Sequence, residues 1–198
     1  MRIHYIANIR LPTEKAHGIQ VMKMCESFAD QGVSVNLIVP TRVNLDIKER
    51  NPFKYYGVRS TFDITKVSSF DPIWLWKLGR GIYIKLQSAF FMLSLSLYLL
   101  FLREKEDIIF YTRDEYLLSL LLRFSKKVVW EGHSLPRRRN SYIRHWRKCF
   151  RIVAISNGLK KDLVGLGLDG NKIFGLKPWI WLVMIITAAG FVFPRIFF

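Results

Sequence analysis

The sequence has few cysteines and few acidic residues for its length. Its two cysteines, Cys25 and Cys149, stand far apart, so there is neither a disulfide framework nor the paired spacing of a cysteine metal site. That usage fits a reducing cytoplasm. The sequence has 15 acidic residues and 31 Lys and Arg residues, which gives a formal net charge of +16. Such an excess favours an acidic partner, which is nucleic acid, an anionic membrane or a phosphorylated substrate.

Internal repeats and low-complexity linkers are also absent, and 198 residues suit one α/β domain better than two small ones. Short β-rich runs predict strands at residues 3–7, 34–39, 62–67, 107–111, 127–130 and 151–155. Helical patterns lie at 18–30, 79–103, 115–125 and 158–166, with a basic loop and helix at 136–148. The alternation predicts an α/β fold in which a mostly parallel sheet carries helices on both faces.

The connection at residues 40–60 is largely polar and contains Asn51, Pro52 and Gly57. It is predicted to be exposed, and loops of this length are often functional.

The helix at 79–103 is apolar nearly all round in its second half. Such a helix is either buried or in lipid. We prefer a core helix that covers the sheet for most of its length, and an exposed part that contacts a membrane is the alternative.

In a parallel α/β sheet, ligands bind at the carboxyl ends of the strands. The turn after the first strand, residues 8–18, leads to His17 and Gly18 at the predicted helix start. A glycine there lets backbone N–H groups approach an anion. A dinucleotide-type Gly-x-Gly-x-x-Gly pattern is absent, and a purely structural loop explains the glycine equally well.

Two further strand ends carry polar groups. Glu131 and His133 stand at i and i+2 of an extended segment, so they share a side and can act on one ligand. The alternative is a structural, hydrogen-bonded histidine. Ser156 and Asn157 follow the sixth predicted strand, where they are good helix caps beside free backbone donors. For Ser156, simple capping is the favoured interpretation.

Together and in this order, these segments resemble the N-terminal domain of glycosyltransferase family 4, the retaining enzymes with a GT-B fold. Residues 12–25 resemble the family's first loop and helix, and residues 51–58 resemble its Pro-Phe-x-Tyr-Tyr-Gly stretch. Segments 111–114, 131–133 and 154–156 then follow in family order. The resemblance covers residue 1 to about residue 174, and the combination is more specific than any single motif.

The resemblance implies a Rossmann-like domain that forms the acceptor-side half of a GT-B enzyme, with a sugar nucleotide as donor substrate. No cofactor or metal is implied, because protein cations and helix ends neutralise the leaving diphosphate. The implied site residues are catalytic His133, donor-proximal His17, Gly18, Glu131 and Ser156, and acceptor-side Arg113, Arg137 and Arg138.

Residues 175–198 form an apolar tail that departs from the family. Family members continue with a turn resembling Asp-Ala-Val-Asp-Leu and a second, donor-binding domain. Residues 179–182, Trp-Ile-Trp-Leu, require the codons TGG-ATH-TGG-YTN, and the frame two bases later can spell Ala-Val-Asp-Leu. This favours a tail that is out of frame. A C-terminal anchor stays open, although the tail is shorter than the roughly 20 apolar residues of a membrane-spanning helix.

We therefore expect the N-terminal half of a transferase for envelope polysaccharide or glycolipid synthesis, inactive until a separate chain or restored frame supplies a donor half. Its partners would be a sugar nucleotide, a glycan or lipid-linked acceptor, and the anionic inner face of the membrane. It would be a cytoplasmic protein bound peripherally at that face. The alternative is a non-catalytic membrane-associated protein that retains a transferase-derived domain.

A nucleic-acid binder is a third interpretation. It rests on basic residues interleaved with aromatic ones, which are Arg137, Arg138, Arg139, Arg144, Arg147, Lys148, Tyr142 and Trp146. We rank it last and expect no nucleic-acid partner, because a peripheral membrane enzyme needs the same basic surface and the remaining chain fits no nucleic-acid module.

Overall fold

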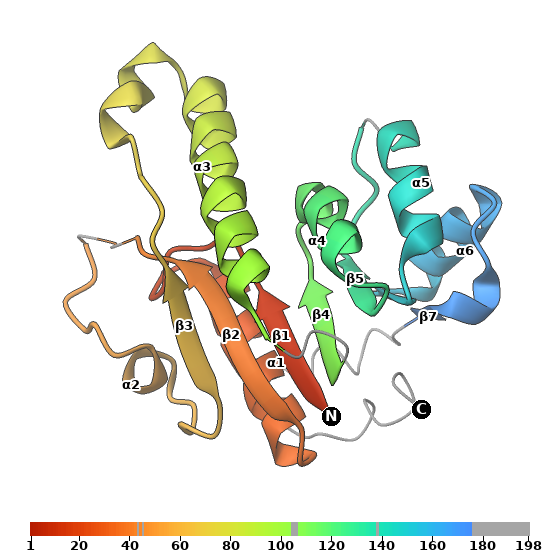
Figure 1. Cartoon of the computed structure of the whole chain (residues 1–198), viewed down its shortest axis with the longest axis horizontal. Helices are drawn as coiled ribbons and strands as arrows, with labels where there is room; N and C mark the ends of the chain where they lie inside the picture. The colour runs from red at the N-terminus through yellow and green to blue at the C-terminus, as the bar shows by residue number, and fades with distance from the viewer. Residues whose placement is uncertain (43, 45, 104–106, 138, 176–198) are drawn as a thin grey trace.

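A computed structural model describes residues 1–175 apart from residues 43, 45, 104–106 and 138 (Figure 1). Seven strands form one parallel sheet in the order β3-β2-β1-β4-β5-β6-β7. The apolar tail from residue 176 onward, with both of its interpretations, lies outside the described residues.

The six predicted strands are confirmed to within one or two residues at each end. The strands are β1 (Arg2–Ile6), β2 (Ser34–Pro40), β3 (Asp63–Val67), β4 (Ile108–Thr112), β5 (Val128–Gly132), β6 (Arg151–Ala154) and β7 (Ile173–Gly175). The helices are α1 (Ala16–Asp30), α2 (Pro52–Tyr56), α3 (Arg80–Phe101), α4 (Leu118–Phe124), α5 (Asn140–Lys148) and α6 (Asn157–Gly165). Short 3₁₀ helices are η1 (Ile73–Leu78), η3 (Glu115–Leu117) and η4 (Gly170–Lys172).

Strand β7 was not predicted. It pairs in parallel with β6, where Ile152 lies opposite Ile173 and Val153 opposite Phe174. Three residues are too few to show a period-2 pattern, so only the neighbouring strand identifies them as a strand. The sheet therefore extends one strand beyond the six that the sequence indicates.

Helices cover both faces of the sheet, which confirms the predicted fold class. Side chains alternate along each strand, so Tyr5 packs on the α1 side while Ile6 packs on the side of α3 and α4. On that second side, Trp130 of β5 stacks on Trp146 of α5 with ring centroids 4.9 Å apart. Burial on both faces explains why the strands read as nearly continuous apolar runs.

Helix α3 is not the core helix that we preferred. Its buried residues Phe91, Leu95 and Leu99 recur every four positions and face the sheet. However, only 17% of its most apolar stretch is buried, and residues 81–101 are long and apolar enough to cross a membrane by length and composition. Both sides of α3 are apolar, and the periodicity of the sequence shows no difference between the side that packs and the side that does not.

The connection at 40–60 is largely exposed, as predicted, although Arg42, Asn44, Ile47 and Val58 are buried. It contains the short helix α2, which Asn51 caps by accepting from the Phe53 N–H at 2.9 Å. The Tyr56 hydroxyl donates to the Thr13 carbonyl and accepts from the Thr13 N–H, both at 2.7 Å. Tyr56 thus joins α2, which has no buried residue, to the loop that follows β1.

Gly18 has a packing role that the sequence did not reveal. Helix α1 begins at Ala16, so Gly18 lies in its first turn and donates its N–H to the Lys15 carbonyl at 2.8 Å. A Cβ at this position would overlap the Tyr56 hydroxyl and lie 2.6 Å from Thr13 Cγ2. The glycine therefore permits close contact with α2, and its donor-proximal role stays a prediction.

We predict that Gly18→Ala lowers the free energy of unfolding by about 1–3 kcal/mol, because the added methyl group overpacks this contact. Gly81→Ala is the matched control, since Gly81 is also near a helix start but has no atom within 4 Å of its added Cβ. The control should leave stability unchanged or raise it by about 0.4–1 kcal/mol. Urea unfolding measures both, and a Gly18→Ala protein as stable as wild type would contradict the packing role.

Candidate functional site

The direction of chain connection reverses between β1 and β4, which are neighbours at the centre of the sheet. In open parallel sheets, ligands bind beside this reversal at the carboxyl ends of the strands. Residues that directly follow β1, β4 and β5 therefore meet at one edge. They include Asn8, Arg113, Asp114 and His133.

A buried carboxylate anchors this edge. Glu131 of β5 is 1% exposed. Its Oε2 accepts from the Tyr111 hydroxyl of β4 at 2.8 Å and from the Tyr5 hydroxyl of β1 at 3.4 Å. Its Oε1 accepts from the Gln20 amide of α1 at 2.7 Å. One side chain thus joins three strands and the first helix.

His133 completes this network and reaches the surface. Its Nε2 lies 2.6 Å from Glu131 Oε1, and the exposed fractions of the two side chains are 23% and 1%. This confirms that the two residues share a side. Because Glu131 is enclosed, only the imidazole can meet a ligand, and the carboxylate acts by fixing the ring's orientation. An oriented imidazole at a ligand-binding edge can exchange a proton or a hydrogen bond with a substrate hydroxyl.

The surroundings keep Glu131 ionised. Burial raises its pKa, but the hydrogen bond and charge of His133, the Tyr111 hydroxyl and the charge of Arg113 outweigh burial, so the pKa lies below its usual value. Burial and the nearby Glu131 charge raise the pKa of Tyr5 and Tyr111 well above the usual value. The two phenols therefore remain protonated donors to a charged acceptor.

Arg113 belongs to the same edge. Its Nη1 donates to Gln20 Oε1 at 2.5 Å, so it orients the amide that bonds Glu131. Burial lowers the pKa of half-buried His17, and the positive charge of Arg113 lowers it further. The structure thus brings Arg113, His17, Glu131 and His133 close together, whereas the acceptor-side role of Arg113 stays a prediction.

The other predicted site residues lie apart from this network. Ser156 caps α6, where its Oγ accepts from the Leu159 N–H at 3.1 Å. The favoured capping interpretation is confirmed, and a donor-proximal role stays a prediction. Arg137 is exposed between β5 and α5, and Arg138 lies outside the described residues.

Sequence reasoning missed Gln20, Tyr5 and Tyr111. All three are buried polar groups within segments that are mostly apolar. A phenol or amide in a buried segment needs a hydrogen-bond partner, so these residues signal a buried polar site. The sequence does not show which distant residue is the partner.

A cavity of about 450 Å³ lies at the same edge, beside the first loop. Segments that follow β1 and β2 and the first turns of α3 enclose it. Its lining residues are Asn8, Ile9, Arg10, Thr13, Glu14, Lys15, His17, Arg42, Asn44, Asp46, Ile73, Tyr83, Ile84 and Gln87. Among the described residues, no group of three or more His, Cys, Asp or Glu side chains could hold a metal ion.

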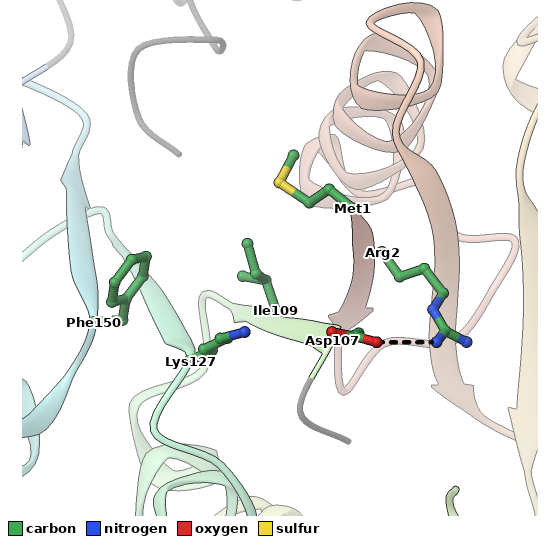
Figure 2. A pocket seen from close by; sticks show the side chains of 6 residues that line it. All are labelled: Met1, Arg2, Asp107, Ile109, Lys127 and Phe150. Atoms are coloured by element: carbon green, nitrogen blue, oxygen red, sulfur yellow. Dashed lines mark ion pairs between the residues drawn. The ribbon is translucent and has the colours of Figure 1, made fainter. Parts of the chain in front are cut away.

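A second cavity, of about 430 Å³, lies at the opposite edge of the sheet (Figure 2). It is lined by residues at or near the amino ends of the strands, including Ile109, Lys127 and Phe150, and by Arg2 and Asp107, which pair at 4.0 Å. Parallel sheets bind ligands at the carboxyl edge, so we place the functional site at Glu131 and His133 instead.

No protein-family model and no curated protein matches the chain. Among solved structures, the chain is similar to HepE from Anabaena in complex with UDP, with a TM-score of 0.54 and 9% identity over 88% of this chain and 43% of that one. It is similar to UDP-GlcNAc 2-epimerase from Methanocaldococcus jannaschii, with a TM-score of 0.57 and 15% identity over 95% and 49% of the two chains. For the lipopolysaccharide outer core galactosyltransferase WaaB in its apo form, the TM-score is 0.53 and the identity 13%, over 88% and 44%.

These similarities establish the fold. The chain has the seven-stranded, Rossmann-like architecture of one half of a GT-B-like structure. It spans less than half the length of each solved structure named above.

We predict that Glu131→Ala lowers the free energy of unfolding by about 1–3 kcal/mol or more, because it leaves the buried donors of Tyr111 and Gln20 without their acceptor. Glu131→Gln keeps the side-chain volume and should cost less. Urea unfolding at neutral pH measures both variants.

The same carboxylate predicts a pH dependence. Folding lowers the pKa of Glu131 from its ordinary value of 4.5, so its ionisation stabilises the fold above that value. The contribution is lost as the pH falls through the lowered folded value. The free energy of unfolding, measured from pH 7 into this acid range, should fall in the wild-type protein. The Glu131→Gln variant should lack this pH-dependent fall. Equal losses would show that Glu131 is not ionised in the folded protein.

Proposed function

We propose that this chain is the acceptor-side half of a retaining, sugar-nucleotide-dependent glycosyltransferase of family 4. The observation that carries the proposal is the imidazole of His133, which buried Glu131 holds at 2.6 Å beside the reversal point of the sheet. Two further lines support it: the ordered motif resemblance along the chain, and a fold similar to that of a galactosyltransferase and a UDP complex.

In this proposal, His133 contacts the sugar that is transferred. Glu131 keeps the ring oriented through the contact of its Oε1 with the imidazole Nε2. Gln20 and Arg113 hold the carboxylate and ring in place. The first loop, with His17, faces the sugar nucleotide across a cleft whose other wall is a second Rossmann-like half. Electrostatic stabilisation of the leaving diphosphate falls to groups of that second half and to helix ends.

We further propose that the enzyme acts in envelope polysaccharide or glycolipid synthesis, and that this chain alone transfers no sugar. Its length, less than half that of the solved structures it resembles, supports the need for a donor half. The purified chain should release no nucleoside diphosphate from common sugar nucleotides above a control without enzyme. Turnover by the chain alone would contradict this part of the proposal.

The function itself is tested by sequencing the DNA beyond the codon of Phe198. The protein encoded when the alternative frame of the tail is restored, the extended protein, is then expressed. We expect the extended protein to release nucleoside diphosphate only when an acceptor is present. Conversion of the sugar nucleotide to an epimer without an acceptor would indicate an epimerase and overturn the transferase proposal.

In the extended protein, His133→Ala should lower kcat about 100-fold, within the usual range for loss of a general acid or base, at a temperature where the variant, which also loses a partner of buried Glu131, is still fully folded. His145→Ala is the matched control, because it removes an imidazole from α5 and should leave kcat unchanged. Loss of activity that only parallels loss of folded protein would make His133 a structural residue.

A further inference from the structure

Positive charge is concentrated between the start of α4 and the start of α6. Residues 116–161 contain 12 Lys and Arg residues and a single acidic residue, Glu131. Glu131 is 1% exposed and belongs to the network at the strand ends. The exposed residues of this segment therefore include many cations and no carboxylate.

Six of these cations form one surface, which we call the α5 surface. Helices α4 and α5 pack together on the same side of the sheet (Figure 1). Burial lowers the pKa of His145, and the charges of Arg144, Lys148 and Arg123 lower it further, so these three cations surround one ring. All six are exposed, and none forms an ion pair within the described part of the chain. They are Arg123, Arg137, Arg139, Arg144, Arg147 and Lys148.

The aromatic residues of the same segment face the interior. Trp146 is 1% exposed and stacks on Trp130 with ring centroids 4.9 Å apart, and Tyr142 stacks on Trp146 at 6.0 Å. Among the described residues between 102 and 163, no large apolar or aromatic side chain is exposed. The α5 surface therefore lacks the rings on which nucleobases stack and the apolar side chains that anchor a helix in a bilayer.

The α5 surface begins beside His133. The loop that carries Arg137 and Arg139 follows β5 at the carboxyl edge of the sheet, and α5 then leads back to the amino end of β6. Helix α5 has nine residues, so it continues the line of positive charge for roughly 13 Å. An extended anionic chain can follow this line away from the imidazole.

The cations of this surface suit carboxylate groups. Five of the six are arginines, whose planar guanidinium can bind both oxygens of a carboxylate. Arg144 and Lys148 stand four positions apart on α5, where like charges destabilise a helix. Bound carboxylates would remove this repulsion.

We propose that the α5 surface binds the carboxylate groups of an acidic polysaccharide. The choice of a polysaccharide among polyanions, and its role as the sugar acceptor, rest on the proposed function. The binding of carboxylates along α5 does not.

Titration calorimetry of the purified full chain tests the proposal with three probes. They are a linear oligogalacturonate, its methyl ester of the same length, and single-stranded DNA with the same number of charges. We expect the acid to bind at least about tenfold more tightly than the ester, because several exposed ion pairs are lost together when the charges are removed. Its binding should weaken between about 0.1 and 1 M salt, since the screening length falls from about 10 to 3 Å.

Two variants separate the α5 surface from net charge. Arg144→Gln with Lys148→Gln changes only exposed side chains, keeps good helix formers, and should weaken oligogalacturonate binding about tenfold. Lys66→Gln with Lys85→Gln is the matched control, because it removes two charges at exposed positions of β3 and α3. The control should bind as wild type.

Four results would overturn the proposal. Equal affinity for the acid and the ester, or binding that ignores salt, would exclude recognition of the carboxylates. Equal losses in the two double variants would show that net charge binds the probe and that the α5 surface has no special part. Tighter binding of the DNA would assign the surface to nucleic acid.

The proposed function is tested separately from this binding. Oligogalacturonate binding by the chain, together with an extended protein that transfers no sugar, would refute the proposed function alone. Sugar transfer by an extended protein that does not bind oligogalacturonate would refute the acidic polysaccharide and leave the transferase in place.

Discussion

The ionised carboxylate of Glu131 is the constraint on which the central structure depends. A buried charge in the sheet must be compensated, and its compensation comes from Tyr5, Tyr111, Gln20 and His133. These groups belong to β1, β4, α1 and the end of β5. A shift of one residue in the register of β1 or β4 would turn its phenol to the opposite face of the sheet. The carboxylate therefore couples strand register to the position of the partly exposed imidazole of His133.

The same arrangement separates structural from functional roles at the carboxyl edge. Glu131 is enclosed and works through His133, which has 23% of its side chain exposed. Gly18 serves packing against Tyr56, and Ser156 serves the start of α6. The first loop packs on α2 through Tyr56, whose hydroxyl bonds the Thr13 N–H and carbonyl.

Helix α3 links this edge to the outer surface of the protein. One side packs on the sheet through Phe91, Leu95 and Leu99, and the opposite side remains apolar in contact with solvent. The cavity at Arg42 lies where its first turns meet the β1 loop.

Much of this fold is determined by local pattern. Period-2 and period-3.6 apolar runs identify six strands and the main helices, and the i, i+2 spacing places Glu131 and His133 on one side, because these signals depend on neighbouring residues alone. Other features depend on residues that only the fold brings together. Tyr5 and Gln20 meet Glu131 across 126 and 111 positions of sequence. Likewise, Gly18 is explained by Tyr56, and β7 is a strand because β6 lies beside it. Which apolar side of α3 faces the sheet was also decided by tertiary packing, since hydrophobic periodicity measures how apolar a face is and not what covers it.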